Sequence, residues 1–303
     1  MMPDTYEHRR YGNDHDRYGW DYSARRAPLR IGGEVKAGAF IVVPLEFFPL
    51  NPSGKPFLHP GAMVTPYPDL RHYTTRDYGL RVGVYRILKE LESRGLKATF
   101  AVNALLLDYC APLIDRIRAA GHEIAAHGLS TDHIHHAGLS LDEERHLISE
   151  TCARFDAHGL RPTTWMSPAR TQSFNTPDLV REAGFTACLD WEMDQVPIAM
   201  KTNHGALDCL PLLNELNDVN LLTGKRQTES EWVAQILAAA RLLLDEHARR
   251  GAQLFGFTLT PYVVGQPFRI HALRELLDAL VRQEQLLLTS ASDLLDAFKQ
   301  PAE

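Results

Sequence analysis

Short apolar runs alternate with segments of helical periodicity along most of this chain. Ala39–Pro44 (AFIVVP) is an unbroken apolar run, as expected of a parallel strand that is buried on both faces. Residues 80–94 (LRVGVYRILKELESR) place apolar side chains at helical spacing and stop at Gly95. Further strands are predicted at 97–102, 123–126, 163–166, 186–189, 207–210, 254–259 and 285–288, with helices at 112–120, 140–158, 229–250 and from 270 and 290 onward.

About seven or eight such strand-helix units in 303 residues favour a distorted (β/α)7-8 barrel in the α/β class. The alternative is a doubly wound sheet, but neither of the glycine-rich phosphate-binding motifs of nucleotide-binding sheets is present. Residues 1–38 have no periodicity and are predicted to be an N-terminal arm, with one barrel domain over 39–303. Residues 49–76 are predicted to be a long loop, and long ordered loops are usually functional.

Charge and hydropathy exclude several classes of partner. The formal net charge is -6, and Lys and Arg are scattered, which argues against a nucleic-acid surface. No apolar run reaches the roughly 18 residues that span a bilayer, and the arm lacks the apolar core of an export signal. The four cysteines are widely spaced, so buried reduced thiols are expected. We therefore expect a cytoplasmic protein that acts on a small molecule.

Polar residues follow most of the predicted strands. In parallel barrels the reactive groups lie at the carboxyl ends of the strands, so these residues are expected to meet at one mouth of the barrel. In chain order they are Glu46, His127, Arg170, Asp190, Trp191, Asn217, Asp218, Thr260 and Tyr262.

Several motifs resemble one known superfamily. Residues 121–128 (GHEIAAHG) are similar to the second motif of the NodB-type polysaccharide deacetylases. Residues 76–86 (RDYGLRVGVYR) resemble a segment of the metal-independent allantoinases and their relatives that hydrolyse cyclic imides, and so do parts of 160–178, 215–218 and 261–269. The resemblance covers roughly residues 35 to 290 in order. It implies the distorted barrel of the polysaccharide deacetylases and a hydrolase of C–N bonds.

The chain departs from that superfamily at its metal site. The metal-dependent members carry paired aspartates after the first strand, where this chain has Glu46, and a second histidine where it has Thr131. A metal site needs three protein ligands, so neither a metal nor another cofactor is expected. The alternative is a zinc site rebuilt from the four histidines His127, His133, His135 and His136.

A second departure is Thr260, which stands where the allantoinase-like branch usually has a histidine before Pro-Tyr. Threonine does not titrate near neutral pH as imidazole does. If that histidine donates a proton in the relatives, another group must donate it here. One of the three loop histidines, His133, His135 or His136, is the predicted replacement.

The resemblance implies hydrolysis of a C–N bond in a small cyclic amide, such as a cyclic imide or a ureide like allantoin. Glu46 and His127 are the candidate base and acid, and Arg170 is the candidate electrostatic stabiliser, although it could equally be a structural ion-pair partner. Asn217 and Asp218 have turn formation as their alternative role, and Trp191 and Tyr262 have packing as theirs. The predicted substrate contacts are Phe47, Asp190, Trp191, Asn217, Asp218, Tyr262 and Gln266.

Two other functions remain open from the sequence. One is a metal-dependent N-deacetylase of a carbohydrate or a small N-acetyl compound, and the other is a catalytically inactive relative that binds a ligand. A homo-oligomer, either a dimer or a tetramer, is also expected. The reason is that the aromatic residues of the arm, namely Tyr11, Tyr18, Trp20 and Tyr22, have no core of their own.

Overall fold

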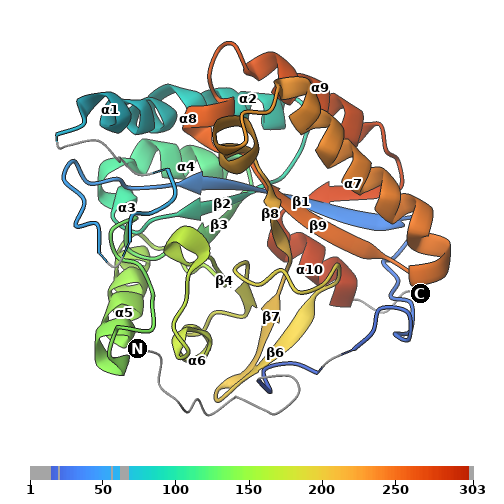
Figure 1. The fold of residues 1–303 in the computed structure, drawn as a ribbon, viewed down its shortest axis with the longest axis horizontal. Coiled ribbons are helices and arrows are strands. Elements are labelled where there is room, and N and C mark those ends of the chain that lie inside the picture. Colours follow the sequence, from blue (N-terminus) through green and yellow to red (C-terminus); the bar gives the residue numbers. More distant parts are fainter. Residues whose placement is uncertain (1–14, 20, 56, 62–67, 300–303) are drawn as a thin grey trace.

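The computed structural model describes residues 15–19, 21–55, 57–61 and 68–299. Strands and helices alternate along the chain, with most strands collected into one sheet (Figure 1). The strands are β1 Ala37–Leu45, β2 Thr99–Val102, β3 Glu123–Ala126, β4 Thr164–Trp165, β5 Ala187–Cys188, β6 Ile198–Thr202, β7 Gly205–Cys209, β8 Leu212–Asn217, β9 Gln253–Thr258 and β10 Leu286–Thr289. The α-helices are α1 Leu70–Tyr78, α2 Val84–Glu92, α3 Leu106–Tyr109, α4 Ala111–Ala119, α5 Leu141–Ala157, α6 Thr176–Glu182, α7 Glu229–Arg250, α8 Pro261–Val264, α9 Ile270–Val281 and α10 Ala291–Lys299.

The sheet is curved into a distorted barrel. Its order is β6-β7-β5-β4-β3-β2-β1-β9-β8, with β10 beside the first half of β1, and only β6 and β7 pair antiparallel. The chain between β7 and β8 joins the two edges, because the Leu210 N–H donates to Cys188 O (3.0 Å) and Pro211 O accepts from the Gly256 N–H (2.8 Å). The predicted fold class is therefore confirmed.

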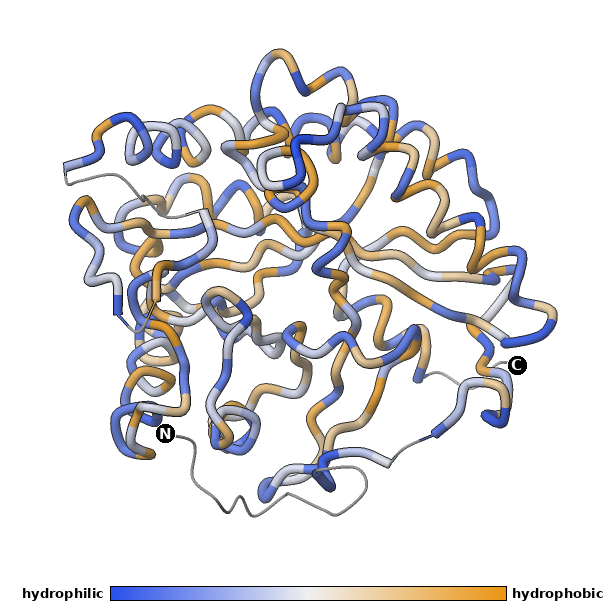
Figure 2. The backbone as a smooth tube through the Cα atoms, viewed as in Figure 1, coloured by the Kyte–Doolittle hydropathy of each residue, from blue (hydrophilic) through white to orange (hydrophobic). Residues whose placement is uncertain are grey.

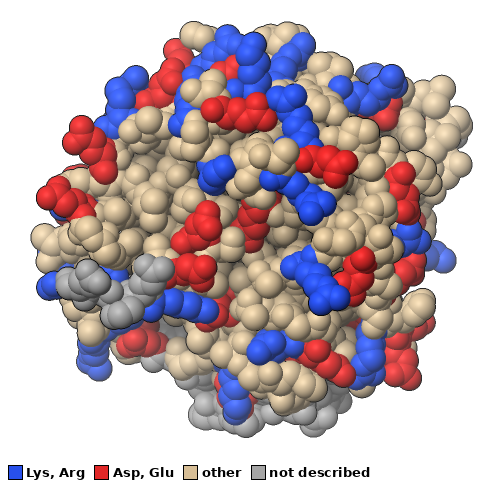
Figure 3. Space-filling view, turned by 180° about the vertical axis from the view of Figure 1, so that it is seen from behind, with Lys and Arg blue, Asp and Glu red and all other residues tan. Residues whose placement is uncertain are grey.

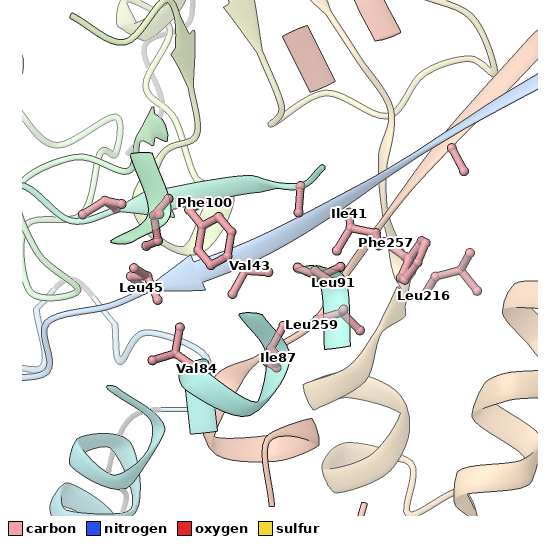
Figure 4. Packing of buried hydrophobic residues seen from close by; sticks show 14 of the residues in the cluster. Ile41, Val43, Leu45, Val84, Ile87, Leu91, Phe100, Leu216, Phe257 and Leu259 are labelled. Atoms are coloured by element: carbon pink, nitrogen blue, oxygen red, sulfur yellow. The ribbon is translucent and has the colours of Figure 1, made fainter. Parts of the chain in front are cut away.

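Strand β1 lies at the centre of the core because its apolar run supplies both faces of the sheet. All nine residues are buried. On one face Ile41 and Val43 belong to the cluster that includes Val84 and Ile87 of α2 (Figure 4). On the other face Phe40 belongs to a second cluster inside the barrel. The strands accordingly follow the hydrophobic stretches of the backbone in Figure 2.

Helix α10 covers the amino ends of the central strands. The Ala291 N–H at its start donates to Thr99 Oγ1 of β2 (2.8 Å), and the Ser292 N–H donates to Glu123 Oε2 of β3 (3.1 Å). Gly38 of β1 lets the helix approach closely, since a Cβ atom at this position would collide with Leu294. This packing leaves the carboxyl ends of the strands as the end where a ligand can enter.

The predicted helix at 80–94 differs from the structure. A longer helical run begins earlier at α1, passes through a π-helical turn at Gly79–Gly83 and continues as α2, so part of the predicted loop 49–76 is helical. Position 83 requires a glycine, because a Cβ atom there would collide with the Pro261 carbonyl of α8. The antiparallel strand β6 is also absent from the prediction, since its burial alternates along a short, mixed run.

The described part of the N-terminal arm packs on its own barrel. The buried Arg17 guanidinium donates to Asp178 Oδ2 (2.8 Å), and Arg26 forms a bidentate pair with Asp194 (2.7 and 2.9 Å). Leu29 forms a parallel bridge with Gly251 at the end of α7. These contacts weaken the reason for expecting an oligomer, because this part of the arm is already covered.

The four aromatic residues of the arm have different outcomes. Tyr18 lies edge-on to Trp191, with ring centroids 6.3 Å apart, and Tyr22 is 57% exposed. Tyr11 and Trp20 lie outside the described residues. The oligomeric state stays a prediction.

The surface carries charges of both signs. On the face shown in Figure 3, Lys and Arg side chains are interspersed with Asp and Glu side chains. Within the described ranges no helix is long and apolar enough to cross a bilayer. A small-molecule partner, rather than a nucleic acid or a membrane, stays a prediction.

Candidate active site

A cavity of about 630 Å³ opens at the carboxyl ends of the strands. It is lined by residues that follow β1, β3, β4, β5, β8 and β9, as expected for a barrel with its site at this end. The three predicted catalytic residues all line it, together with three of the predicted substrate contacts. These six residues are Glu46, His127, Arg170, Asp190, Asn217 and Tyr262.

A buried carboxylate between two imidazoles forms one wall of the cavity. Glu46 Oε1 lies 3.1 Å from His59 Nε2 and 3.6 Å from His127 Nε2. The side chains are 9%, 7% and 2% exposed for Glu46, His59 and His127 respectively. Glu46 follows β1 and His127 follows β3, whereas His59 comes from the segment between β1 and α1. We call these three residues the Glu-His-His cluster.

Backbone carbonyls fix the orientation of both rings. His59 Nδ1 lies 2.6 Å from Pro60 O, and His127 Nδ1 lies 2.9 Å from Met166 O. A carbonyl oxygen only accepts hydrogen bonds, so each Nδ1 carries the hydrogen. Both Nε2 atoms are buried and make no hydrogen bond to any described residue, although Glu46 lies close to each. The cluster therefore presents two ring nitrogens that are free to bind a proton or a cation.

The electrostatics of the cluster keep Glu46 ionised. Burial by itself raises the pKa of this carboxyl, but the neighbouring imidazoles of His59 and His127 outweigh burial and bring the pKa to about 2. A carboxylate with so low a pKa is a poor general base near neutral pH. Glu46 thus acts as a fixed negative charge rather than as the group that takes a proton from water.

Two polar side chains hold the loops of the cluster in place. The buried Asn103 accepts from the Phe47 N–H (2.8 Å) and donates to the His127 carbonyl. Thr131, at the position where the metal-dependent relatives carry a histidine, donates from Oγ1 to Phe47 O (2.8 Å). Both residues tie the chain after β1 to the chain after β3, which sets the distance between Glu46 and His127.

Arg170 reaches the cavity from a strained turn. Ala169 and Arg170 have φ angles of 55° and 54°, in the left-handed region that non-glycine residues rarely occupy. Such strain is typical of functional sites. The Arg170 Nη2 donates to Asp190 O (3.3 Å), and Nε is buried without a hydrogen-bond partner in the described part of the chain. The guanidinium therefore retains a donor for a ligand.

Asp218 and Thr260 form a buried pair beside the cavity. Asp218 accepts from the Thr260 N–H and from Thr260 Oγ1, both at 2.7 Å, and from the Val219 N–H (3.0 Å). Burial raises the pKa of the Asp218 carboxyl to about 7, against these hydrogen bonds, which lower it. Thr260 lines the cavity and Asp218 does not. The Asp218 carboxyl can therefore hold a proton near neutral pH, and one hydrogen bond connects it to Thr260 at the cavity wall.

Tyr262 contributes a hydrogen-bond donor. The Arg76 guanidinium lies 4.8 Å from the centroid of its ring, and burial followed by the charge of Glu46 raises the pKa of its phenol. The hydroxyl therefore stays protonated.

Asp190 has a different role, since its carboxylate accepts from the Ser167 N–H (2.9 Å) and from Gln172 Nε2 (2.6 Å). It shapes the turn that carries Arg170.

Four predicted substrate contacts, Phe47, Trp191, Asp218 and Gln266, do not line the cavity. Phe47 stacks on Tyr109, with ring centroids 5.8 Å apart, and Trp191 Nε1 donates to Gln172 Oε1 (2.8 Å). Gln266 donates to Tyr262 O (3.3 Å). The structure therefore does not bring these four side chains to the cavity, because a residue next to a strand end can also point into the core.

The three loop histidines lie away from the cavity. His133 Nδ1 pairs with Ser130 Oγ (2.6 Å), the buried His135 pairs with Glu144 (2.9 Å), and His136 contacts the Gly138 N–H (3.1 Å). None of them lines the cavity. The structure therefore does not bring any of the three to the mouth of the barrel, because each is paired within the loop or with Glu144 of α5.

The structure does not bring together the metal-ligand set that the sequence suggested as an alternative. Within the described residues, one group of at least three potential ligands has its ligand atoms within 4.8 Å of one another, and it is the Glu-His-His cluster. His127 belongs to it, but His133, His135 and His136 do not. The member that the sequence missed is His59. Its one signal was its place in the long segment 49–76, which was predicted to be functional.

Comparison with known proteins agrees with this architecture. Residues 67–188 match the family model described as polysaccharide deacetylase. A crystal structure named Puue allantoinase is 23% identical, with a TM-score of 0.79, and the match covers 90% of this chain and 94% of that chain. A search of curated protein sequences found no match.

Two further structures carry polysaccharide deacetylase as a provisional name. The one from Mycobacterium smegmatis is 22% identical (TM-score 0.75, covering 92% of this chain and 96% of that chain). The one from Pseudomonas aeruginosa PAO1 is 21% identical (TM-score 0.75, covering 88% and 91%). At these identities the structures show a shared fold. The family model adds a match to the polysaccharide deacetylases over residues 67–188 of this 303-residue chain.

Proposed function

We propose that this protein hydrolyses a C–N bond of a small cyclic amide, such as a cyclic imide or a ureide. The observation that carries the proposal is the Glu-His-His cluster on the wall of a 630 Å³ cavity that Arg170 also lines. Cavities of this size hold small molecules, for which the usual range is roughly 300–1,000 Å³. A neighbour named allantoinase, with the same fold over 90% of this chain, supports the choice of a cyclic amide.

The cluster activates the attacking water. Because each Nδ1 is engaged by a carbonyl, the Nε2 atoms of His59 and His127 are the groups that can accept a proton from water. Glu46 remains ionised and stabilises the resulting positive charge on an imidazole. In this proposal an imidazole is the base, and Glu46 orients it and stabilises its positive charge. The sequence had left the base open between Glu46 and His127.

Arg170 stabilises the negative charge that develops on the amide oxygen. Attack on an amide carbonyl creates an oxyanion, and a preorganised cation with a free donor is worth several kcal/mol to such a transition state. Arg170 lines the cavity and is the candidate cation, with Glu192 3.9 Å from its Nη2. The Tyr262 hydroxyl, which stays protonated, can donate to a second oxygen or nitrogen of the ring.

The Asp218–Thr260 pair supplies a proton to the leaving nitrogen. In the structure Thr260 Oγ1 donates to Asp218 Oδ1. Once Asp218 is protonated this bond reverses, and Asp218 donates to Thr260 Oγ1 as the threonine hydroxyl proton moves to the nitrogen. The C–N bond then breaks without forming an amide anion. The Asp218 pKa of about 7 makes the protonated form available near neutral pH. This route replaces the histidine that the related branch is expected to carry at position 260.

The test is a turnover assay with succinimide, hydantoin and allantoin, and with N-acetylglucosamine oligomers as the alternative substrate class. Each substrate is incubated with wild-type protein and with Glu46→Gln, in metal-supplemented and in chelator-treated buffer. We expect ring opening of at least one cyclic amide by wild type and a loss of roughly 10²–10⁴-fold in the variant. Cleavage of the N-acetyl compounds alone would overturn the substrate class. Binding of a cyclic amide without any turnover would favour the inactive relative.

A further inference from the structure

We propose that Glu46, His59 and His127 form a binding site for one divalent transition-metal ion, with zinc as the favoured occupant. The sequence predicts no metal, because the ligand set of the metal-dependent relatives is incomplete. The proposed site keeps the residues after β1 and β3 and takes its third ligand from a different segment, between β1 and α1. The inference rests on the proposed function for the role of the ion, but not for its binding. With an ion bound, the two Nε2 atoms are its ligands, and activation of the water would pass from the imidazoles to the ion.

The unpaired ring nitrogens are the first reason for a cation. With hydrogen on Nδ1, each ring directs its Nε2 lone pair into the space that also holds the Glu46 carboxylate. Lone pairs and a carboxylate in a buried space repel one another unless positive charge lies between them. Neither nitrogen has a hydrogen-bond partner among the described residues. One divalent cation satisfies all three groups at once.

The spacing of the three atoms suits a tetrahedral ion. Zinc binds histidine nitrogen and carboxylate oxygen at about 2.0–2.1 Å, so two ligands of a tetrahedral site lie about 3.3 Å apart. Glu46 Oε1 lies 3.1 Å from His59 Nε2 and 3.6 Å from His127 Nε2, and all three ligand atoms lie within 4.8 Å of one another. The two distances from the carboxylate to the imidazoles are therefore close to those of a tetrahedral site.

The supporting contacts are those of a metal-binding histidine. Such histidines usually donate their second ring N–H to a carbonyl or carboxylate, which fixes the ring and its tautomer. His59 donates to Pro60 O and His127 donates to Met166 O. The His59 ring also meets the Phe48 ring edge-on, with centroids 5.7 Å apart. Both rings are therefore oriented in the absence of any ion.

Three protein ligands are the number found in catalytic zinc sites, in which the fourth position is left to water or substrate. Glu46, His59 and His127 all line the cavity, so the open position of the site would face it. An ion held there would lower the pKa of a bound water to about 7 and so supply the nucleophile. Thr131 takes no part, since its hydroxyl is bonded to the Phe47 carbonyl.

The first test measures binding without any substrate. Full-length protein is freed of metal with a chelator and titrated with Zn²⁺ by calorimetry, and with Co²⁺ by visible spectroscopy. We expect about one ion per chain and the intense visible bands of four- or five-coordinate Co²⁺, together with a rise in Tm on adding Zn²⁺. Absence of stoichiometric binding in wild type would overturn the proposal without touching the proposed hydrolysis, which the turnover assay tests separately.

Variants then locate the ion. We expect His59→Ala and Glu46→Gln to weaken Zn²⁺ affinity by roughly 10²-fold or more, since each removes one of three ligands. His133→Ala is the matched control, because His133 is a loop histidine next to the site that pairs with Ser130 instead. The Zn²⁺ affinity of His133→Ala should equal that of wild type.

Should His133→Ala lose the ion while His59→Ala keeps it, the ion binds elsewhere and the assignment is wrong. Circular dichroism of each metal-free variant separates loss of a ligand from loss of the fold.

Discussion

The two ends of the central strands each carry a glutamate, and the two glutamates have opposite surroundings. At the amino end, Glu123 of β3 accepts from Thr164 Oγ1 (2.5 Å), Thr99 Oγ1 (2.6 Å) and the Ser292 N–H (3.1 Å). At the carboxyl end, Glu46 lies between the Nε2 atoms of two imidazoles, and neither Nε2 has a hydrogen-bond partner in the described part of the chain. One end of the barrel is closed by α10, and the other opens into the cavity.

This difference separates a structural carboxylate from a functional one. Native proteins pair nearly all their buried polar groups, so an unpaired group in a buried site indicates a missing proton, water, ion or substrate. Glu123 has all the donors it needs, and its network joins β2, β3, β4 and α10. Glu46 has neighbours that can bind something further. Residue type alone cannot distinguish the two, since both are glutamates next to a strand of the same sheet.

The largest effect is expected from Glu46→Gln. Glutamine keeps the volume but removes the negative charge that stabilises an imidazolium or a metal ion, so turnover should fall roughly 10²–10⁴-fold. The measurement is kcat/KM per folded molecule on whichever cyclic amide wild type hydrolyses. If kcat/KM of the variant stays within a few-fold of the wild-type value, the negative charge of Glu46 has no catalytic role.

The matching change at the other end is Glu123→Gln, and it should affect stability instead. An amide nitrogen would face donors that need an acceptor, and leaving buried groups unpaired costs about 1–3 kcal/mol. Denaturant unfolding should show this loss, while kcat per folded molecule stays close to wild type. A large fall in kcat with unchanged stability would remove the contrast between the two ends.

A smaller effect is expected in the pH dependence of stability. Asp218 has a pKa of about 7 in the folded protein against an ordinary value of 3.8, so the folded state binds more protons between these values. Stability from this group is therefore present at low pH and is lost as pH rises from about 4 to about 7, by about 1 kcal/mol per pH unit. Asp218→Asn should remove that slope.

Glu46, with its pKa of about 2, acts in the opposite direction, and its contribution to stability is lost as pH falls below about 4.5. The test is the unfolding free energy of wild type and of Asp218→Asn, measured from pH 5 to pH 8. If this free energy changes equally with pH in both proteins, Asp218 is ionised throughout that range.

Most of the fold could be predicted from the sequence because its signals are local. The apolar run of β1, the serine N-cap and capping box at the start of α5, and the alternation of elements each depend on a few neighbouring residues. The hairpin of β6 and β7 and the π-helical turn at Gly79–Gly83 could not be predicted in the same way. Both depend on tertiary partners, namely the sheet edge and the Pro261 carbonyl.

The site could be predicted only in part. Strand ends indicated Glu46, His127 and Arg170, because the carboxyl ends of parallel strands meet at one mouth. His59 was missed because it lies on a loop, where no periodicity indicates which side chain turns inward. Asn103 was missed because its role is to bridge two backbones, and a single asparagine after a strand carries no distinguishing pattern.

The measurement that tests the central claim most directly is the single-turnover rate of His59→Ala beside that of His72→Ala. The account holds that the Glu-His-His cluster is the reactive centre, and His59 is the member that neither the fold nor any motif requires. His72, on α1, pairs with Asp69 (2.7 Å) and does not line the cavity, so its variant controls for loss of a nearby histidine. The account predicts that His59→Ala loses at least about 10²-fold in rate while His72→Ala stays near wild type. A His59→Ala variant that is folded and as fast as wild type would contradict it.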